Sequence, residues 1–284
     1  MAAWLTYLRE RFPLPVYLLL VSGLVASGAL FSSSRIDWQP ATISFVGLMI
    51  FFAVLRLMDE LKDLEKDKIA HPERPLPRGI ITVNQAEQAV SIAAAFMLLW
   101  ALCSALITNY AAGACYAIVT AYLWLMYREF YCGTWLEQRP LLYAVTHQLI
   151  LVPLAYFSVL LTSPELLTSA DTLYFSLPLI GAFFGYEVCR KLDPQAHPVL
   201  RTYLHTHGRV GSLLIVSAAM LIAGTGAWLL ELSTVLWPFE IALLLSMTLI
   251  WLRPDAFKIT EGVAGLCLIA HLWAIPVKVL WSSL

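Results

Sequence analysis

Long apolar runs constrain this chain more than any other feature of its sequence. A backbone that crosses ~30 Å of hydrocarbon must pair its own polar groups, which a helix of ~20 apolar residues does. Nine such runs alternate with polar segments. We therefore predict an all-α, polytopic membrane bundle of about nine transmembrane helices, forming a single domain over residues 1–284. The runs are Phe12–Phe31, Ala41–Met58, Ala86–Ile107, Ala111–Tyr127, Leu141–Leu161, Thr172–Cys189, Val210–Leu232, Thr234–Leu252 and Glu261–Trp281.

The composition supports this prediction and excludes other classes. Hydrophobic residues make up 60% of the chain and charged residues 13%, whereas a soluble domain is about half apolar and about a quarter charged. The net charge of −1 gives no reason to expect a nucleic-acid partner. The five cysteines form no C-x-x-C pair, so neither a zinc site nor a disulfide framework is expected.

The basic residues predict how the bundle is oriented. With nine crossings, Arg35 and Lys278 are the only members of the 18 Lys and Arg residues on one face, which leaves 16 on the other. Basic segments stay in the cytoplasm, so we expect a cytoplasmic N-terminus and a C-terminus on the far side. The longer polar loops share the cytoplasmic face. We expect a multi-pass protein of a bacterial inner membrane with its site on that face.

The first group of candidate site residues ends the second apolar run. Asp59, Asp63 and Asp67 are spaced four apart, which places them on one face of a helix. Like charges at this spacing repel, and carboxylates suit Mg²⁺, which binds through one or two of them together with substrate phosphates. The alternative is a solvated helix end neutralised by Lys62, Lys66 and Lys68.

A proline-braced loop follows and favours the metal-binding interpretation. It reads Pro-Glu-Arg-Pro-Leu-Pro-Arg-Gly over residues 72–79 and places Arg74 and Arg78 near the acidic face. Arginine recognises phosphate through a planar fork. The D-x-x-x-D-x-x-x-D pattern followed by R-P-L-P-x-G-x-x-T resembles the UbiA-type intramembrane prenyltransferases. The resemblance implies that these acids bind Mg²⁺ and a prenyl diphosphate.

The second candidate group follows the sixth apolar run and departs from the family pattern. The family has a second D-x-x-x-D there, but this chain has Glu187 at the first acidic position and Lys191 at the second. Glu187 could still hold Mg²⁺ while Arg190 and Lys191 bind the diphosphate directly. Alternatively, part of the metal binding is lost and the activity is changed or absent. A charged helix end facing water is a third interpretation.

A third group lies around the fourth loop. Arg128 and Arg139 are candidates for further diphosphate contacts. Aromatic rings stabilise cations, but aromatic residues also form belts at membrane interfaces. His147 could orient an acceptor or bond a carbonyl group. We expect the prenyl or acceptor pocket to include Tyr127, Tyr131, His147 and Tyr186.

The resemblance implies transfer of a prenyl group from an isoprenoid diphosphate to a lipophilic acceptor in the membrane, with Mg²⁺ as cofactor, and we expect the acceptor to be aromatic. Asp59, Asp63, Asp67 and Glu187 are its predicted catalytic metal ligands. Two alternatives remain: a terpene cyclase that uses the same diphosphate site, and a non-catalytic membrane protein that binds prenyl lipids. An ion-coupled transporter is disfavoured, because transporters place charged groups at mid-membrane and this chain gathers them at one face.

Overall fold

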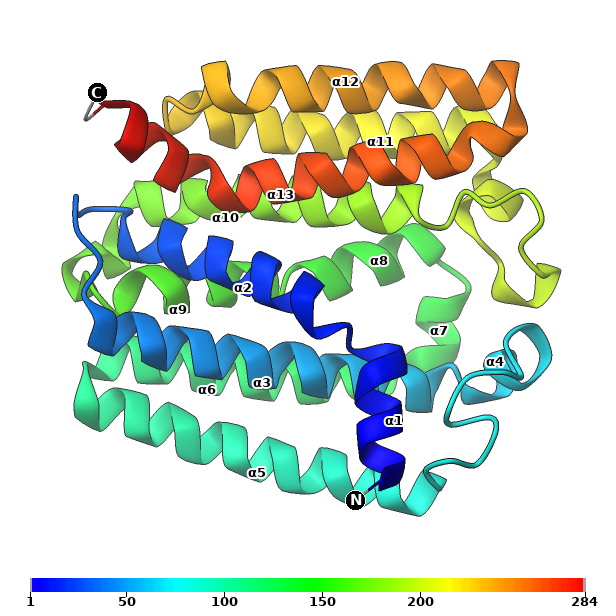
Figure 1. Ribbon diagram of the computed structural model, residues 1–284, viewed down its shortest axis with the longest axis horizontal. Coiled ribbons are helices and arrows are strands. Elements are labelled where there is room, and N and C mark those ends of the chain that lie inside the picture. Colours follow the sequence, from blue (N-terminus) through cyan, green and yellow to red (C-terminus); the bar gives the residue numbers. More distant parts are fainter. Residues whose placement is uncertain (1, 283–284) are drawn as a thin grey trace.

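Every regular element among the described residues is a helix, and the long helices run side by side along one axis (Figure 1). The computed structural model describes residues 2–282. Its α-helices are α1 (Ala2–Arg11), α2 (Leu14–Ala29), α3 (Trp38–Lys62), α4 (Leu64–Ala70), α5 (Val83–Ile107), α6 (Tyr110–Tyr127), α7 (Gly133–Glu137), α8 (Pro140–Gln148), α9 (Leu151–Leu160), α10 (Ala170–Cys189), α11 (Tyr203–Leu229), α12 (Ser233–Leu252) and α13 (Phe257–Ser282). Four short 3-10 helices join them: η1 (Glu129–Tyr131), η2 (Pro164–Thr168), η3 (Pro198–Leu200) and η4 (Pro254–Ala256).

The described helices confirm the polytopic bundle. Eight spans are long and apolar enough to cross a membrane, with α8 and α9 together counted as the span Pro140–Leu160. The pair α1 and α2 gives a ninth span if its 63° bend is accepted. Pro13 lies at this bend in an extended conformation. Proline has no backbone N–H to donate to a helical hydrogen bond, and its ring disfavours the helical conformation of the residue before it. The first predicted run thus becomes the 16-residue α2, with α1 turned away from the bundle axis.

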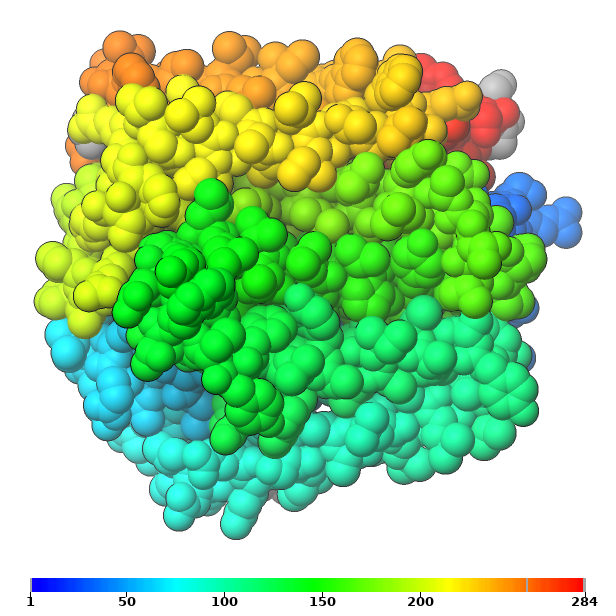
Figure 2. Space-filling view, turned by 180° about the vertical axis from the view of Figure 1, so that it is seen from behind, coloured from blue at the N-terminus to red at the C-terminus, as the bar shows by residue number. Residues whose placement is uncertain are grey.

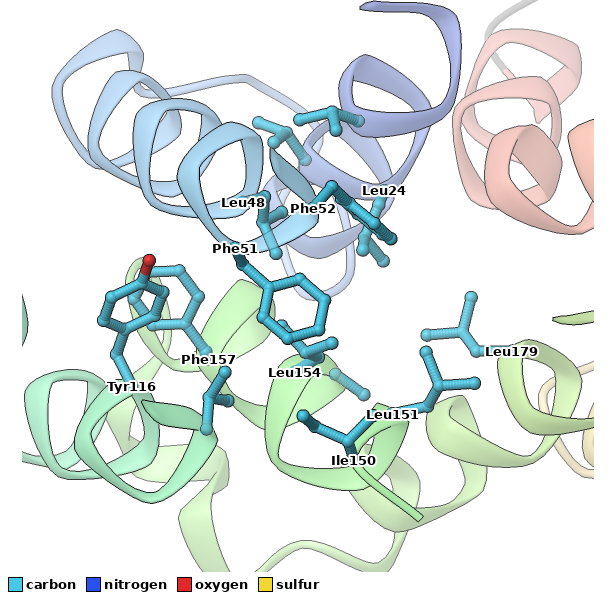
Figure 3. Packing of buried hydrophobic residues seen from close by; sticks show 14 of the residues in the cluster. Leu24, Leu48, Phe51, Phe52, Tyr116, Ile150, Leu151, Leu154, Phe157 and Leu179 are labelled. Carbon is cyan, nitrogen blue, oxygen red and sulfur yellow. The ribbon is translucent and has the colours of Figure 1, made fainter. Parts of the chain in front are cut away.

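Apolar packing joins the helices in two buried clusters. The larger cluster is centred on α2, α3, α6, α9 and α10, and Figure 3 shows Phe51, Phe157 and Leu154 meeting in it. The Tyr116 hydroxyl donates to the Gly47 carbonyl at 2.6 Å, so its polar end is satisfied at depth. The smaller cluster fills the space among α10 to α13. Helices α10 and α13 contribute buried residues to both clusters and so connect them.

The polar segments gather at one end of the bundle, which we call the polar end. There the segments after α3, α6 and α10 lie together (Figure 2). Helix α4 packs against η3, and Lys66 on α4 reaches Glu137 on α7 at 3.7 Å. Helix α1 crosses the bundle near this end, and the C-terminal end of α13 lies at the opposite end (Figure 1). The fold therefore brings three loops that are far apart in sequence to one place.

Candidate functional site

The acidic segment is two helices rather than one. Helix α3 ends at Lys62, Asp63 caps it, and α4 begins at Leu64. The amide of Asp63 still donates to the Asp59 carbonyl at 2.9 Å, and the amide of Asp67 donates to the Asp63 carbonyl at 2.8 Å. Backbone hydrogen bonds between residues four apart therefore continue through the break. The side chains differ, since Asp63 is exposed and Asp67 is buried.

Asp67 is buried and fully paired. Both of its carboxylate oxygens accept hydrogen bonds from Arg74 Nη1, at 2.6 and 2.7 Å, and its side chain is 3% exposed. A buried charge is costly, and each member of this pair compensates the charge of the other. The pair closes the proline-braced loop onto α4. Its presence means that the metal contact predicted for Asp67 and the diphosphate contact predicted for Arg74 would both require it to open.

Asp59 and Asp63 have no such partner. Among the described residues, neither carboxylate forms a salt bridge or accepts a side-chain hydrogen bond. Asp59 is half-buried, and the charges it feels are those of Lys62, Asp63, Glu187 and Arg190. The end of α3 therefore faces the end of α10, and two unpaired carboxylates lie on the α3 side of the site.

Glu187 anchors the α10 side with two cations. Arg190 Nε donates to one of its oxygens at 2.5 Å, and Lys191 Nζ donates to the other at 2.5 Å. The carboxylate beside it raises the pKa of the Arg190 guanidinium. This trio carries a net charge of one positive unit, because a single acid balances only one of two bases. It is better matched to an anion than to a bare metal ion.

Lys62 is a site residue that the sequence prediction did not include. Its ammonium lies 3.2 Å from His147 Nε2 and 3.3 Å from the Met126 carbonyl, and it sits 5.2 Å from the centre of the Tyr143 ring. His147 Nδ1 lies 2.7 Å from the Tyr143 carbonyl, so Nδ1 carries the proton and Nε2 accepts from Lys62. The sequence showed Lys62 only as one of several cations beside the acids, because its partners come from α6 and α8.

The other predicted arginines lie at the rim of the polar end. Arg78 Nη2 donates to both oxygens of Glu10 on α1, at 2.8 and 2.9 Å. Arg128 and Arg139 are exposed, and each lies over an aromatic ring of its own segment, at 5.7 Å from Tyr131 and at 4.3 Å from Trp135 respectively. The structure therefore places these three arginines around the site rather than within the group formed by Asp59, Glu187 and Arg190.

The predicted aromatic residues divide in the same way. Tyr131 is 71% exposed on η1, and Tyr127 is half-buried against Trp124. Tyr186 lies between the two buried clusters, next to Glu187. Tyr17 on α2, which the sequence prediction omitted, interacts electrostatically with Asp59 and Arg190. No local motif marks Tyr17, and only the packing of α2 against α3 brings it to the site.

The donor set fits a magnesium ion that a substrate helps to bind. Among residues 2–282, no three His, Cys, Asp or Glu side chains come together closely enough to hold a metal by themselves. Mg²⁺ does not need such a cage, because it keeps several waters and binds through one or two carboxylates plus substrate phosphates. The unpaired carboxylates of Asp59 and Asp63 meet that requirement.

Comparisons with known proteins identify the family of this chain and a solved structure of similar fold. The model of the UbiA prenyltransferase family matches residues 19–275. A solved structure described as "Structural and mechanistic insights into the biosynthesis of Digeranylgeranylglyceryl phosphate synthase in membranes" is similar in fold, with a TM-score of 0.65 and 15% sequence identity, over 99% of this chain and 100% of that one. A search of curated protein sequences found no match. Since the family model covers most of the sequence, the chain belongs to the UbiA prenyltransferase family.

Proposed function

We propose that this protein transfers the prenyl group of an isoprenoid diphosphate to a lipophilic, aromatic acceptor inside the membrane. The observation that carries the proposal is the pair of unpaired carboxylates, Asp59 and Asp63, at the polar end of a membrane bundle, where Asp59 lies close enough to Glu187 and Arg190 to feel their charges. Family membership supports prenyl transfer in general. The basic bias of the polar end supports a cytoplasmic position for the site.

The charges of the site support a requirement for Mg²⁺. Asp59, Asp63 and Glu187 supply three negative charges, and Lys62, Arg190 and Lys191 supply three positive ones. A multiply charged diphosphate would make this balanced group strongly negative. Bound Mg²⁺ would restore the balance, and it would supply Lewis-acid stabilisation of the charge that develops on the leaving diphosphate. Asp59 and Asp63 would hold it, and Glu187 would become a further ligand only if its pair with Arg190 or Lys191 opened.

The side chains of the site have distinct roles in the proposed reaction. Arg190 and Lys191 bind the diphosphate oxygens, and Lys62, held in place by His147, adds a third cation. Cleavage of the C1–O bond leaves its electron pair on the diphosphate and an allylic cation on the prenyl group. These fixed positive charges stabilise the departing anion in the transition state. The acceptor then forms a bond to C1 and loses a proton to water.

The aromatic side chains would protect the allylic cation from water. Tyr17 belongs to a series of ring contacts: it stacks on Phe12 at 3.7 Å between ring centres and lies tilted against Phe52 at 6.0 Å. Phe52 in turn stacks on Phe183 at 6.3 Å. The series leads from Asp59 into the bundle, and ring faces attract cations. Tyr186, next to Glu187, would line the same space, and Tyr127, Tyr131 and His147 remain proposed on the acceptor side.

Release of diphosphate by purified protein in detergent tests the proposal. The reaction contains Mg²⁺ and prenyl diphosphates of several chain lengths, first without an acceptor and then with a pool of phenolic lipids. We expect release that depends on both Mg²⁺ and an acceptor. Release without an acceptor, together with a hydrocarbon product, would assign the chain as a cyclase instead. Saturable Mg²⁺-dependent binding with no release would assign a non-catalytic binder, consistent with Lys191 at the second acidic position.

A further inference from the structure

A second polar cluster lies beside the candidate site, on a different face of α3. Its centre is Glu60, whose side chain is 3% exposed. One oxygen of Glu60 accepts hydrogen bonds from Arg11 Nε on α1 and pairs with Arg56 Nη2 at 3.1 Å, one turn earlier on α3. Tyr7 lies one turn before Arg11 on α1 and is buried. The cluster therefore ties α1 to the last turns of α3.

The cluster contains polar atoms that no protein group satisfies. Among the described residues, buried side-chain atoms without a partner include the Tyr7 hydroxyl, Arg11 Nη2, Arg56 Nε and Glu60 Oε2, and the one other such atom is the Ser44 hydroxyl. Unpaired buried polar groups are costly, so they are normally completed by water or a ligand. Here three groups can donate and one accepts. An ordered water suits this set, because it can accept from the arginines and donate to Glu60. An anion would instead meet the Glu60 carboxylate.

The position of Glu60 connects this cluster to the candidate site. Glu60 follows Asp59, and successive residues of a helix point about 100° apart. Asp59 faces Glu187 and Arg190 on α10, whereas Glu60 faces α1. A fixed Glu60 therefore sets the rotation of the last turn of α3. That turn carries Asp59 and ends beside Asp63, so its rotation decides where the unpaired carboxylates point.

We propose that Glu60 is a positioning residue for the diphosphate site. Held by Arg11 and Arg56, with an ordered water completing the cluster, it locks α3 against α1 and keeps Asp59 and Asp63 directed toward the substrate. The inference rests on the proposed function, since it concerns the same site. The proposal also gives α1 a role. Because the chain bends at Pro13, α1 is not collinear with α2, and its Arg11 reaches Glu60 at the end of α3.

Substitutions of Arg11 and Glu60 test the proposal. Arg11→Gln and Glu60→Gln each remove one charge of the cluster while leaving every proposed metal and diphosphate ligand in place. Arg9→Gln is the matched control, because it removes the same charge from an exposed position on the same helix. Diphosphate release would be measured against Mg²⁺ and prenyl diphosphate concentrations, with thermal unfolding in detergent measured in parallel.

We expect the Arg11 and Glu60 variants to need about 10-fold more Mg²⁺ for half-maximal release, the typical effect of losing a group that orients a metal ligand. Arg9→Gln should behave as the wild type. Arg11→Lys keeps the charge and should show a smaller change in the same direction, which keeps the test informative if a neutral variant fails to fold. Variants that unfold at lower temperature but keep the wild-type Mg²⁺ requirement would overturn the positioning role. A wild-type protein that neither binds nor releases diphosphate would overturn the proposed function itself.

Discussion

At the scale of single residues, the acidic pattern separates into two kinds of carboxylate. Asp59 and Asp63 are unpaired among the described residues, whereas Asp67 is buried under Arg74. The identical spacing in the sequence does not reveal this difference, because it depends on which arginine folds back onto which acid. The two kinds should respond differently to substitution.

Asp63→Asn should remove activity without affecting folding. Asp63 is exposed and makes no side-chain capping hydrogen bond, so its loss should leave the thermal unfolding temperature near that of the wild type. Loss of one group that stabilises transition-state charge costs roughly 10²–10³-fold in rate. Diphosphate release per folded protein measures the effect. Glu65→Gln, an exposed acid two residues away on α4, is the control and should keep its rate. Equal rates in both variants would contradict the role of Asp63.

Asp67→Asn should instead lower stability. It leaves the half-buried Arg74 guanidinium without its carboxylate, and breaking one partner out of a buried pair costs about 3–5 kcal/mol. Thermal unfolding in detergent should show a clear decrease, and the double variant with Arg74→Met should lose less than the sum of the two single changes. An Asp67→Asn variant with unchanged unfolding but a raised Mg²⁺ requirement would favour the metal contact predicted for Asp67.

At the scale of the elements, one buried polar pair joins two membrane helices away from the acidic motifs. Glu240 on α12 and His271 on α13 are almost fully buried, and His271 Nε2 lies 3.0 Å from the Glu240 carboxyl. His271 Nδ1 lies 2.7 Å from the Cys267 carbonyl of its own helix. Polar groups at membrane depth are normally paired with each other. This pair accordingly explains how α12 can carry an acid within an apolar run.

His271→Leu should destabilise the protein by about 1–2 kcal/mol, because it leaves the Glu240 carboxyl buried without its partner. Glu240→Gln should lose less, since its amide can still hydrogen-bond the imidazole. Chemical or thermal unfolding in the same detergent compares the two. Larger losses for Glu240→Gln than for His271→Leu would show that the charge, rather than the hydrogen bond, holds α12 to α13.

At the scale of the whole molecule, the bundle has one polar end: α1 crosses the bundle toward that end, and the C-terminal end of α13 lies at the opposite end (Figure 1). An odd number of crossings requires this arrangement, and it agrees with counting the bent pair α1 and α2 as one span. The distribution of Lys and Arg then predicts that the polar end faces the cytoplasm.

Reporter fusions in a bacterial host can test this orientation. We expect alkaline phosphatase fused after residue 282 to be active, because the proposed orientation places the C-terminal end of α13 outside the cytoplasm. A fluorescent protein fused within the segment 71–80, which follows α4, should be fluorescent. The reverse pattern would place the diphosphate site outside the cell and contradict the proposed orientation.

The sequence by itself determined the number and approximate limits of the spans, because hydrocarbon thickness fixes their length and the backbone must pair internally. It also located both charged segments of the candidate site, since acids and bases in polar loops are visible without a fold. The chemistry of proline explains why the helix breaks at Pro13, but it does not determine the direction in which α1 turns.

Only the tertiary structure decided which charges meet. Asp67 pairs with Arg74, 7 residues away in the sequence. Lys62 contacts His147 and the Met126 carbonyl, 85 and 64 residues away, and Glu60 pairs with Arg11, 49 residues away. The three longer contacts depend on helix rotation and on which loops share an end of the bundle. Both are set by the packing of apolar faces far from the charges, and no local pattern around an acid or a base encodes that packing.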